Sequence, residues 1–514
     1  MTVALVRAKW IVTGVQDRHT ANILSDAALA HQNGKVVAVG AFEEMRQRFP
    51  DAAVTQHPGH VLLPGFVNSH HHVGLTPLQL GSPDHALELW FASRMSARDV
   101  DIYLDTLYSA FEMIASGITT VQHIHGWMRG SFEQVHGASS AVLKAYQSIG
   151  MRASYCYAVR EQNRLVYEDD AKFCAGLPQD VGVPLAEHLK QATLSFSDHM
   201  KLYKMLRDEN EGQSLTRIQL APANLHWITD DGLMAMVEQA KADDVPMHMH
   251  LLETVYQKEY ARRRTGTTAV KHLHKLGALG PWLTLGHAVW LTEEDVELVA
   301  HSMTCVCHNC SSNFRLRSGV APINELARRG VTIGMGLDEA GINEDRDMMQ
   351  EIKLALRAHR VPGMDEDDVP SCPQVLRMAS EHGAKTTAFR GQIGRLDPGM
   401  QFDAVAIDYQ AATYPYQDED IPVLDALIQR AHQRHVDTVY VGGDPIYVKG
   451  RFKYIDRDKV LGEIAEQLSR PRSAAEEKRR QLSKAVFPHV KNFYAGYLDG
   501  ESARQPFYGP SSRN

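Results

Sequence analysis

Histidine and acidic side chains stand at the ends of several apolar segments of this 514-residue chain. The first of these segments ends in Ser69-His70-His71-His72. On a β-strand, residues i and i+2 face the same side, so His70 and His72 could project together while His71 points the other way. Two imidazoles on one face can bind a zinc-like ion at about 2.0–2.1 Å. The alternative is a polar loop that happens to contain histidines.

A second cluster reads His248-Met249-His250-Leu251-Leu252-Glu253. One of its two imidazoles could supply a third ligand, and the residues alone do not decide which. Glu253 lies just past the predicted strand, where it could reach a substrate without binding the ion. A hydrolase needs such an acid to protonate its leaving group, which contributes about 10²–10⁴ in rate. The alternative is a buried strand histidine beside an unrelated surface glutamate.

Two further strand ends carry polar side chains, His287 in LTLGHAVWL and Asp338 in GVTIGMGLDEAG. A carboxylate at the end of an apolar strand is costly to bury without a partner, and a metal ion is one such partner. Glu339, the next residue, is the alternative candidate for this carboxylate. A lone histidine is more often structural, and Asp338 could simply cap the next helix.

The segments before these residues are predicted to be the strands of an α/β fold, a (β/α)8 TIM-like barrel. Short apolar strands alternate with amphipathic stretches such as 101–116, which is the pattern of βα units. Barrel active sites lie at the C-terminal ends of the strands, so the joint placement of the polar residues favours a metal site. The predicted strands are 61–68, 119–124, 152–159, 217–223, 245–251, 283–288, 304–308 and 331–338.

Both ends of the chain read as short strands joined by turns. Asn33-Gly34 is a strong hairpin signal, and β-rich stretches return at 394–408 and 436–454. These patterns predict a small β-sandwich domain formed from both chain ends, with the barrel inserted between them. The aromatic-bearing tail could form an arm that packs on a neighbouring subunit. The predicted domains are the sandwich at 1–60 plus 392–456, the barrel at 61–391, and a C-terminal helix and extended tail at 457–514.

Composition excludes several classes of protein. The formal net charge of −8 argues against a nucleic-acid or anionic-membrane partner, because binding phosphates needs a basic face. No window approaches the ~18 apolar residues of a membrane span, and the N-terminus does not resemble a signal peptide. Six cysteines do not make a disulfide framework in so long a chain, so we expect a cytoplasmic setting. We interpret Cys305, Cys307 and Cys310 as small buried hydrophobic residues and not as ligands of a structural zinc ion.

The motifs PGFVNSHHH, HMHLLE, LGHAVWL and MGLDEAG resemble the metal motifs of the amidohydrolase superfamily. The likeness is to the branch that holds atrazine/triazine hydrolases, S-adenosylhomocysteine deaminase, guanine deaminase and cytosine deaminase. Residues 308–348 also resemble that branch's stretch HNPxSNxxLxSGxxPxxxLxxxGVxVxLGTDG. The resemblance covers roughly residues 1–455.

This resemblance implies a site with one divalent metal ion, Zn²⁺ or else Fe²⁺. Glu253 would be the proton shuttle, and His287 would orient the attacking water while Asp338 accepts its proton. The fourth strand, RIQLAPANLHW, ends without the lysine that bridges two metals in binuclear relatives, which favours a single ion. The implied ligands are His70, His72, His250 and Asp338.

The expected reaction is deamination of an amino-substituted nitrogen heterocycle, such as a purine, pyrimidine, triazine or imidazole-like ring. A divalent ion can lower the pKa of water toward ~7, so that hydroxide is available at neutral pH. The alternative is hydrolysis of a cyclic or linear amide or urea, or displacement of a halide, thiol or alkylamine from such a ring. A non-catalytic scaffold is disfavoured because every implied ligand is present. Relatives are often dimers or tetramers, so we expect a homodimer or homotetramer.

Departures from the family pattern bear on the substrate. The usual TDG reads Leu337-Asp338-Glu339, and HNP reads His308-Asn309-Cys310. The adenosylhomocysteine deaminases carry a substrate-contacting histidine after the fourth strand, where this chain has Ala223-Asn224, which argues against an adenosine-type substrate. The residues predicted to contact substrate are Trp90, His123, His125, Arg160, Gln162, Asn163, Asn224, His226, Trp227, Asn309 and Glu339.

Overall fold

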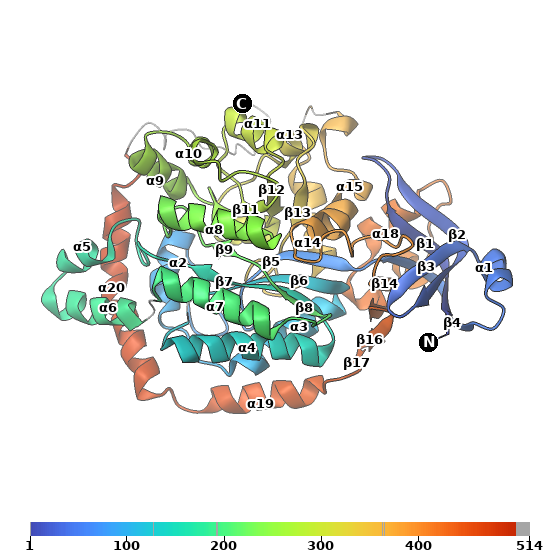
Figure 1. The fold of residues 1–514 in the computed structure, drawn as a ribbon, viewed down its shortest axis with the longest axis horizontal. Coiled ribbons are helices and arrows are strands. Elements are labelled where there is room, and N and C mark those ends of the chain that lie inside the picture. The colour runs from blue at the N-terminus through green and yellow to red at the C-terminus, as the bar shows by residue number, and fades with distance from the viewer. Residues whose placement is uncertain (1, 127, 192–193, 362, 364, 500–514) are drawn as a thin grey trace.

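The computed structural model describes residues 2–126, 128–191, 194–361, 363 and 365–499. Two parallel sheets form the centre of the molecule, surrounded by helices (Figure 1). The first sheet has the order β5-β6-β7-β8, with the short β9 paired to β7, and the second has the order β10-β11-β12-β13. Their strands are β5 (Phe66–His71), β6 (Ile118–His125), β7 (Arg152–Val159), β8 (Thr216–Ile218), β9 (Ala221–Pro222), β10 (Met247–Leu251), β11 (Leu283–His287), β12 (Cys305–His308) and β13 (Ile333–Met335).

Isolated bridges join the two parallel sheets at both edges. Leu220 bridges Met247 on one side, and His71 bridges Asp338 on the other. The backbone N–H of Asp338 also donates a hydrogen bond of 2.8 Å to the carbonyl of His70. The strands therefore form a ring, as in a TIM-type barrel, and their C-terminal ends meet at one rim.

Helices cover the outside of this ring, so the strands are buried on both faces; every residue of β6, for example, is buried. Asp101 caps the start of α3, the helix before β6, by accepting hydrogen bonds from the N–H groups of Tyr103 and Leu104. The helices of this region are α2 (Leu87–Arg94), α3 (Ile102–Ala115), α4 (Phe132–Ile149), α5 (Asp170–Ala175), α6 (Gln179–Gln191), α7 (Phe196–Glu209), α8 (Asp230–Asp243), α9 (Val255–Thr265), α10 (Ala269–Leu276), α11 (Glu293–His301), α12 (Cys310–Arg315), α13 (Ile323–Arg328), α14 (Met348–Ala358), η1 (Glu366–Asp368), α15 (Cys372–Arg377), η2 (Met378–His382) and α16 (Gly383–Lys385).

Strands from both ends of the chain share one eight-stranded mixed sheet, seen at the right of Figure 1. Its order is β17-β16-β15-β14-β4-β1-β2-β3, in which β4 pairs with β1 in parallel and with β14 antiparallel. The predicted sandwich is not confirmed, and the proposed domain boundaries stay a prediction. The sheet comprises β1 (Ala4–Val15), β2 (Ala21–Gln32), β3 (Lys35–Ala41), β4 (Ala53–Pro64), β14 (Ala404–Asp408), β15 (Val436–Val441), β16 (Asp444–Val448) and β17 (Arg451–Phe452), with α1 (Phe42–Arg48), α17 (Tyr409–Thr413), α18 (Val423–Arg430) and η3 (Gln433–His435) nearby in the chain.

The predicted strand 61–68 is wrong in its bounds, because the chain changes sheets within it. Its first half belongs to β4 of the mixed sheet, and its second half begins β5 of the barrel. Between them, the N–H of Gly65 donates to the carbonyl of Asp403, while the N–H of Phe66 donates to Gly117 in the barrel. The Asn33-Gly34 hairpin is confirmed: both residues have positive φ, +53° and +79°, and they join β2 to β3.

After the mixed sheet, the chain returns to the barrel as α19 (Arg457–Ser469) and α20 (Ala474–Ala495), which run along its lower and left edges in Figure 1. Ser483 of α20 donates a hydrogen bond of 2.8 Å to the carbonyl of Ala92 in α2. The Tyr494 hydroxyl accepts one of 3.2 Å from the N–H of Tyr167. Most of the predicted subunit arm, residues 500–514, lies outside the described residues.

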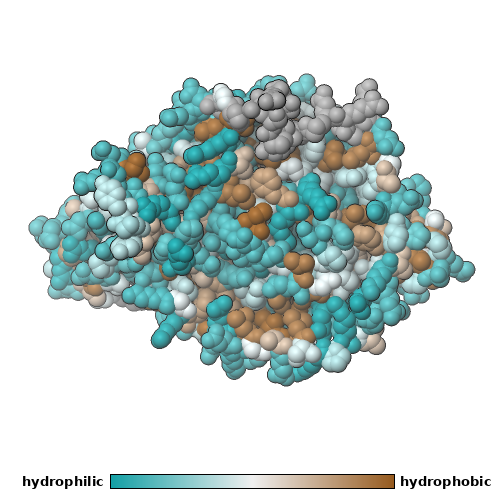
Figure 2. Space-filling model, turned by 180° about the vertical axis from the view of Figure 1, so that it is seen from behind, coloured by the Kyte–Doolittle hydropathy of each residue, from teal (hydrophilic) through white to brown (hydrophobic). Residues whose placement is uncertain are grey.

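The face shown in Figure 2 is mainly hydrophilic, with apolar side chains gathered chiefly near its lower edge. Within the described ranges, no helix is both long enough and apolar enough to cross a bilayer. All six cysteines are free and buried, and Cys305 and Cys307 lie in β12 as expected.

Candidate active site

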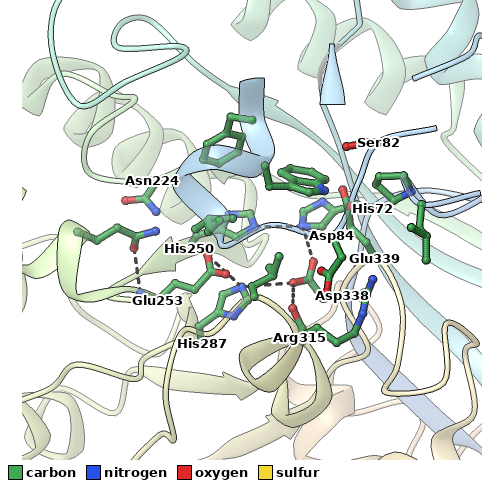
Figure 3. A pocket seen from close by; sticks show the side chains of 18 of the residues that line it. His72, Ser82, Asp84, Asn224, His250, Glu253, His287, Arg315, Asp338 and Glu339 are labelled. Atoms are coloured by element: carbon green, nitrogen blue, oxygen red, sulfur yellow. Dashed lines mark hydrogen bonds and ion pairs between the residues drawn. The ribbon is translucent and has the colours of Figure 1, made fainter. Parts of the chain in front are cut away.

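Three imidazoles and one carboxylate meet at the rim of the barrel, from the ends of β5, β10 and β13. Figure 3 labels three of these residues, His72, His250 and Asp338. Nε2 of His72 lies 3.0 Å from Nε2 of His70 and 3.1 Å from Nε2 of His250. Oδ1 of Asp338 lies 3.2 Å from Nε2 of His72 and 3.6 Å from Nε2 of His70. The residues that the sequence suggested as ligands therefore point at a common centre.

Hydrogen bonds on the far side of each ring set which nitrogen faces this centre. Nδ1 of His72 donates to the carbonyl of Ile124 at 2.7 Å, and Nδ1 of His250 donates to that of Ala223 at 2.8 Å. A carbonyl can only accept, so both Nε2 atoms carry bare lone pairs. Nδ1 of His70 lies 2.7 Å from Nε2 of His248, whose ring is fully buried behind it. Such outer partners fix the orientation of metal-binding imidazoles.

The donor set fits a divalent cation. Lone pairs that converge at about 3 Å with a carboxylate repel one another unless a positive ion lies between them. Burial lowers the pKa of His70 and of His250 well below the usual value, and that of His72 to about 4, so the rings are neutral at pH 7. Neutral imidazole and ionised carboxylate are the forms that bind metals. Nitrogen and oxygen donors in this number suit Zn²⁺ or Fe²⁺.

Asp338 is held by its neighbours and by its backbone. Its Oδ2 accepts a hydrogen bond of 2.5 Å from the Ser312 hydroxyl, which leaves Oδ1 facing the imidazoles. Asp338 has φ +55° and His287 has φ +70°, both in the left-handed region that non-glycine residues rarely adopt. Strained backbone of this kind clusters at functional sites, where surrounding contacts hold the side chain in place.

Glu253 lies beside this centre but points its carboxylate toward His287, with Oε2 at 3.7 Å from Nε2. Its backbone N–H donates to Oε1 of Gln257, and its Oε1 accepts a hydrogen bond from the Ser318 hydroxyl. Burial raises the pKa of Glu253 well above its usual value, and Asp338 and Glu88 nearby raise it further. A carboxyl group with a raised pKa holds its proton more tightly, which suits it to act as a general acid.

His287 is positioned to accept a hydrogen bond at the centre. Its Nδ1 donates to Oδ1 of Asn313 at 2.9 Å, so Nε2 carries the lone pair. Nε2 accepts a hydrogen bond of 3.2 Å from Asn309 and lies 3.8 Å from Oδ2 of Asp338. Burial lowers the pKa of His287, which keeps the ring neutral.

A pocket opens over these groups and encloses about 740 Å³, including its mouth. One wall is apolar and aromatic: the rings of Phe91 and Trp227 meet edge to face with centroids 5.4 Å apart, and Trp90 packs on Phe91. The guanidinium of Arg160 lies 4.0 Å from the centre of the Trp227 ring. Such a wall can stack against a flat ring.

The residues predicted to contact substrate fall into three groups. Trp90, Arg160, Asn224, Trp227 and Glu339 line the pocket. His123 and His125 line a neighbouring cavity, where their Nδ1 atoms contact the hydroxyls of Tyr146 and Tyr155. The other four support residues of the pocket lining: Gln162 and Asn163 donate to the carbonyl of His226, whose ring packs on Trp227, and Asn309 contacts His287.

Several site residues escaped the sequence reasoning. Arg94, which lines the neighbouring cavity, forms an ion pair with Glu339 of the pocket, and Arg315 adds a guanidinium to the pocket lining. Ser312 and Asn313 hold Asp338 and His287 from the start of α12. Both lie in HNCSSN, the segment that resembles the family's HNPxSN stretch, so this resemblance could have predicted that they belong to the site.

Comparison with known proteins identifies the fold's relatives. The model of the amidohydrolase family matches residues 61–446. The chain belongs to the amidohydrolase family. A bacterial imidazolonepropionase-like composite domain also matches residues 27–52, which include the second half of β2, β3 and α1.

Curated relatives of this amidohydrolase are 5-methylthioadenosine/S-adenosylhomocysteine deaminases. That of Thermodesulfovibrio yellowstonii is 23% identical over 469 residues, which cover 89% of this chain and 96% of the relative. That of Moorella thermoacetica is 29% identical over 414 residues, covering 79% and 86%. These relatives and the family confirm the expectation of a hydrolase that acts on C–N bonds.

Solved structures share the fold of this amidohydrolase. An adenosine deaminase of Xanthomonas campestris with bound zinc superposes with a TM-score of 0.75 at 24% identity, covering 94% of this chain and 98% of its own. An atrazine chlorohydrolase of Arthrobacter aurescens with zinc gives 0.73 at 20% identity, covering 90% and 99%. Guanine deaminase of E. coli gives 0.66 at 18%, covering 87% and 99%.

Proposed function

We propose that this amidohydrolase deaminates an amino-substituted nitrogen heterocycle and releases ammonia. The observation that carries the proposal is the placement of a buried carboxyl, Glu253, and a neutral imidazole, His287, on one side of the four-donor cluster, under a pocket with an aromatic wall. The deaminase relatives support the same reaction class.

The ligands in this proposal are Nε2 of three histidines and Oδ1 of Asp338, around one Zn²⁺, with Fe²⁺ as the alternative. When bound, the ion supplies positive charge that lowers the pKa of water to near neutrality. The structural neighbours crystallised with zinc support the choice of metal. The histidine ligands are His70, His72 and His250.

The proton transfers follow from the positions of three side chains. Asp338 accepts a proton from the attacking water, which Nε2 of His287 aligns by accepting its hydrogen bond in place of the one from Asn309. Glu253 gives its proton to the ring nitrogen as the water oxygen bonds to the neighbouring ring carbon. Asp338 then passes its proton to the departing amine, and the hydroxyl proton returns to Glu253 as the ring carbonyl forms. One water is consumed, and one ammonia leaves.

The pocket wall supports a flat ring as the substrate, with Phe91 and Trp227 beside it. The methylthioadenosine and adenosylhomocysteine deaminase names belong to the relatives. Here the chain has Ala223-Asn224 in the segment where those enzymes carry a histidine, and Glu339, paired with Arg94, lines the same pocket. The substrate we propose is therefore an aminated heterocycle other than adenosine.

A substrate panel tests the proposal. Purified enzyme is incubated with aminopurines, aminopyrimidines and aminotriazines, and ammonia is measured together with the ring product. Ammonia in equal amount to a ring carbonyl supports deamination. A new carboxylate without ammonia from ring opening, or release of halide, thiol or alkylamine, would support the alternative reactions of the same site instead.

We further propose that the parallel strands make a complete (β/α)8 barrel within the range 61–391, in which the barrel itself starts with β5 at Phe66. The end of β4 would belong with residues 1–60 and 392–456 to the second domain, around the mixed sheet. A homodimer or homotetramer stays a prediction, which the mass of the purified protein in solution can test.

A further inference from the structure

A second group of potential metal ligands lies on the mixed sheet, away from the barrel rim. His57 and His60 belong to β4, and Asp437 belongs to β15. One ligand atom of each lies within 4.8 Å of the other two. The three side chains are largely buried but not closed off, with exposed fractions of 7%, 12% and 12%.

The spacing of this group matches that of the barrel site. Nδ1 of His57 lies 3.7 Å from Oδ1 of Asp437, and Nε2 of His60 lies 3.5 Å from Oδ2. Both separations are too long for hydrogen bonds. They are close to the 3.2 and 3.6 Å between imidazole nitrogen and Asp338 oxygen at the barrel rim. Two ligands about 2.0–2.2 Å from one ion are separated by such distances.

Hydrogen bonds on the outer side of each imidazole leave the other ring nitrogen unprotonated and facing Asp437. Nδ1 of His60 donates to the carbonyl of Pro58 at 2.8 Å, so its Nε2 carries a lone pair. That Nε2 is buried and has no hydrogen-bond partner within the described residues. Nε2 of His57 lies 2.7 Å from the hydroxyl of Tyr440, which can accept its proton and leave Nδ1 bare toward Asp437. The carbonyl-held ring of His60 thus resembles the rings of His72 and His250 beside Asp338, whereas His57 is held by a hydroxyl.

A simple ion pair does not account for the group. Lys449 is the nearby cation, but its Nζ is 3.9 Å from Oδ2 of Asp437 and its side chain is 77% exposed. An exposed pair at this distance contributes little. Thr438 donates a hydrogen bond of 2.7 Å to Oδ1 of Asp437 and leaves the other lone pairs of the carboxylate unused.

We propose that His57, His60 and Asp437 form a second divalent metal site, distinct from the catalytic centre. Two imidazoles and one carboxylate favour Zn²⁺, Co²⁺ or Ni²⁺ over Mg²⁺ or Ca²⁺, which prefer all-oxygen sites. The ion completes its coordination with water on the exposed side. Because the ion joins β4 to β15, it links segments from the two ends of the chain. It therefore stabilises the mixed sheet, from which the chain continues after β4 into the barrel.

Metal titration tests this site with Zn²⁺ alone as the probe. Full-length enzyme that already holds one equivalent is dialysed against increasing Zn²⁺, and bound metal and the melting temperature are measured. The wild type is expected to take up a second equivalent, and its melting temperature to rise with Zn²⁺ concentration. Ca²⁺ at the same concentrations should add no second equivalent. Loss of an outer-shell partner alone weakens metal sites about 10–100-fold, so loss of a ligand should weaken this one by at least about 100-fold.

Four variants complete the test. His60→Gln and Asp437→Asn should lose the second equivalent and the shift in melting temperature. Lys449→Met should bind Zn²⁺ at least as tightly as the wild type, because a competing positive charge is gone. His274→Gln, which removes an exposed histidine of α10, should behave as the wild type. The proposal is overturned if the wild type takes up no second equivalent, or if both ligand variants retain it.

Discussion

The hydroxyl of Ser312 donates a hydrogen bond of 2.5 Å to Oδ2 of Asp338. Both side chains are buried, and the bond fixes the carboxylate so that Oδ1 faces the imidazoles. Ser312 comes from α12, which begins right after β12, so the helix start and the end of β13 are tied together at the site.

Ser312→Ala should lower turnover by about 10–100-fold, the usual effect of removing a partner of a metal-site residue. Metal content should fall or stay unchanged, but the fold should remain, because only one hydroxyl is lost. The matched control is Ser311→Ala, which removes the neighbouring buried hydroxyl of α12, on the side of Glu351. Equal activity of the two variants would mean that the Ser312 bond does not position Asp338.

Glu253→Gln should retain the metal and lose about 10²–10⁴ in turnover, because the amide has no proton to give to the ring nitrogen. His250→Ala should lose both metal and activity. Steady-state kinetics with elemental analysis of each variant checks the pair. Wild-type turnover in Glu253→Gln would show that another group is the acid.

Gly336→Ala should disrupt the metal site through packing alone. A Cβ there would lie 2.3 Å from Oδ1 of Asn309 and 2.5 Å from Cβ of His70, closer than real contacts allow. We expect lower metal occupancy and a lower melting temperature. Gly137→Ala, in α4 with nothing within 4 Å of the new Cβ, should leave both unchanged or raise stability by about 0.4–1 kcal/mol. Normal occupancy in Gly336→Ala would contradict the close packing behind His70.

Asp403→Asn should destabilise the protein strongly, because it breaks a buried pair between the barrel and the mixed sheet. Arg152 of β7 contacts Asp403 through Nε at 2.6 Å and a second nitrogen at 3.1 Å, and both side chains are at most 4% exposed. Breaking such a pair costs about 3–5 kcal/mol of unfolding free energy. Asp26→Asn, which breaks the exposed pair with Arg7, should cost less than about 1 kcal/mol. Denaturant unfolding compares them, and equal losses would contradict the role of the buried pair.

Strand ends were the part of the site that could be predicted from sequence. Several apolar segments of the sequence end in a polar residue, and such residues mark the C-terminal ends of strands, which a barrel brings to one rim. These residues are His70, His72, Glu253, His287 and Asp338. The choice between His248 and His250 could not come from alternation alone, since residues two apart face the same way. In the structure, the two rings differ in depth: His248 contacts Nδ1 of His70 from behind, whereas His250 reaches the centre.

The pocket wall was less predictable because its contacts join distant segments. Arg94 in α2 meets Glu339 after β13, a pairing that no local pattern indicates. Gln162 and Asn163 follow a strand as predicted, but their amides donate to the carbonyl of His226 and so support the pocket lining. The sheet change at Gly65 was missed for a related reason: the apolar run 61–68 continues through it, and only hydrogen bonds to Asp403 and Gly117 separate the two strands.

One measurement tests the central claim most directly: an anomalous difference map from crystals of the purified enzyme, recorded on both sides of the zinc and iron absorption edges. We predict a peak at the barrel rim, about 2.0–2.2 Å from Nε2 of His70, His72 and His250 and from Oδ1 of Asp338. A metal-containing enzyme whose map has no peak among these four side chains would contradict the account.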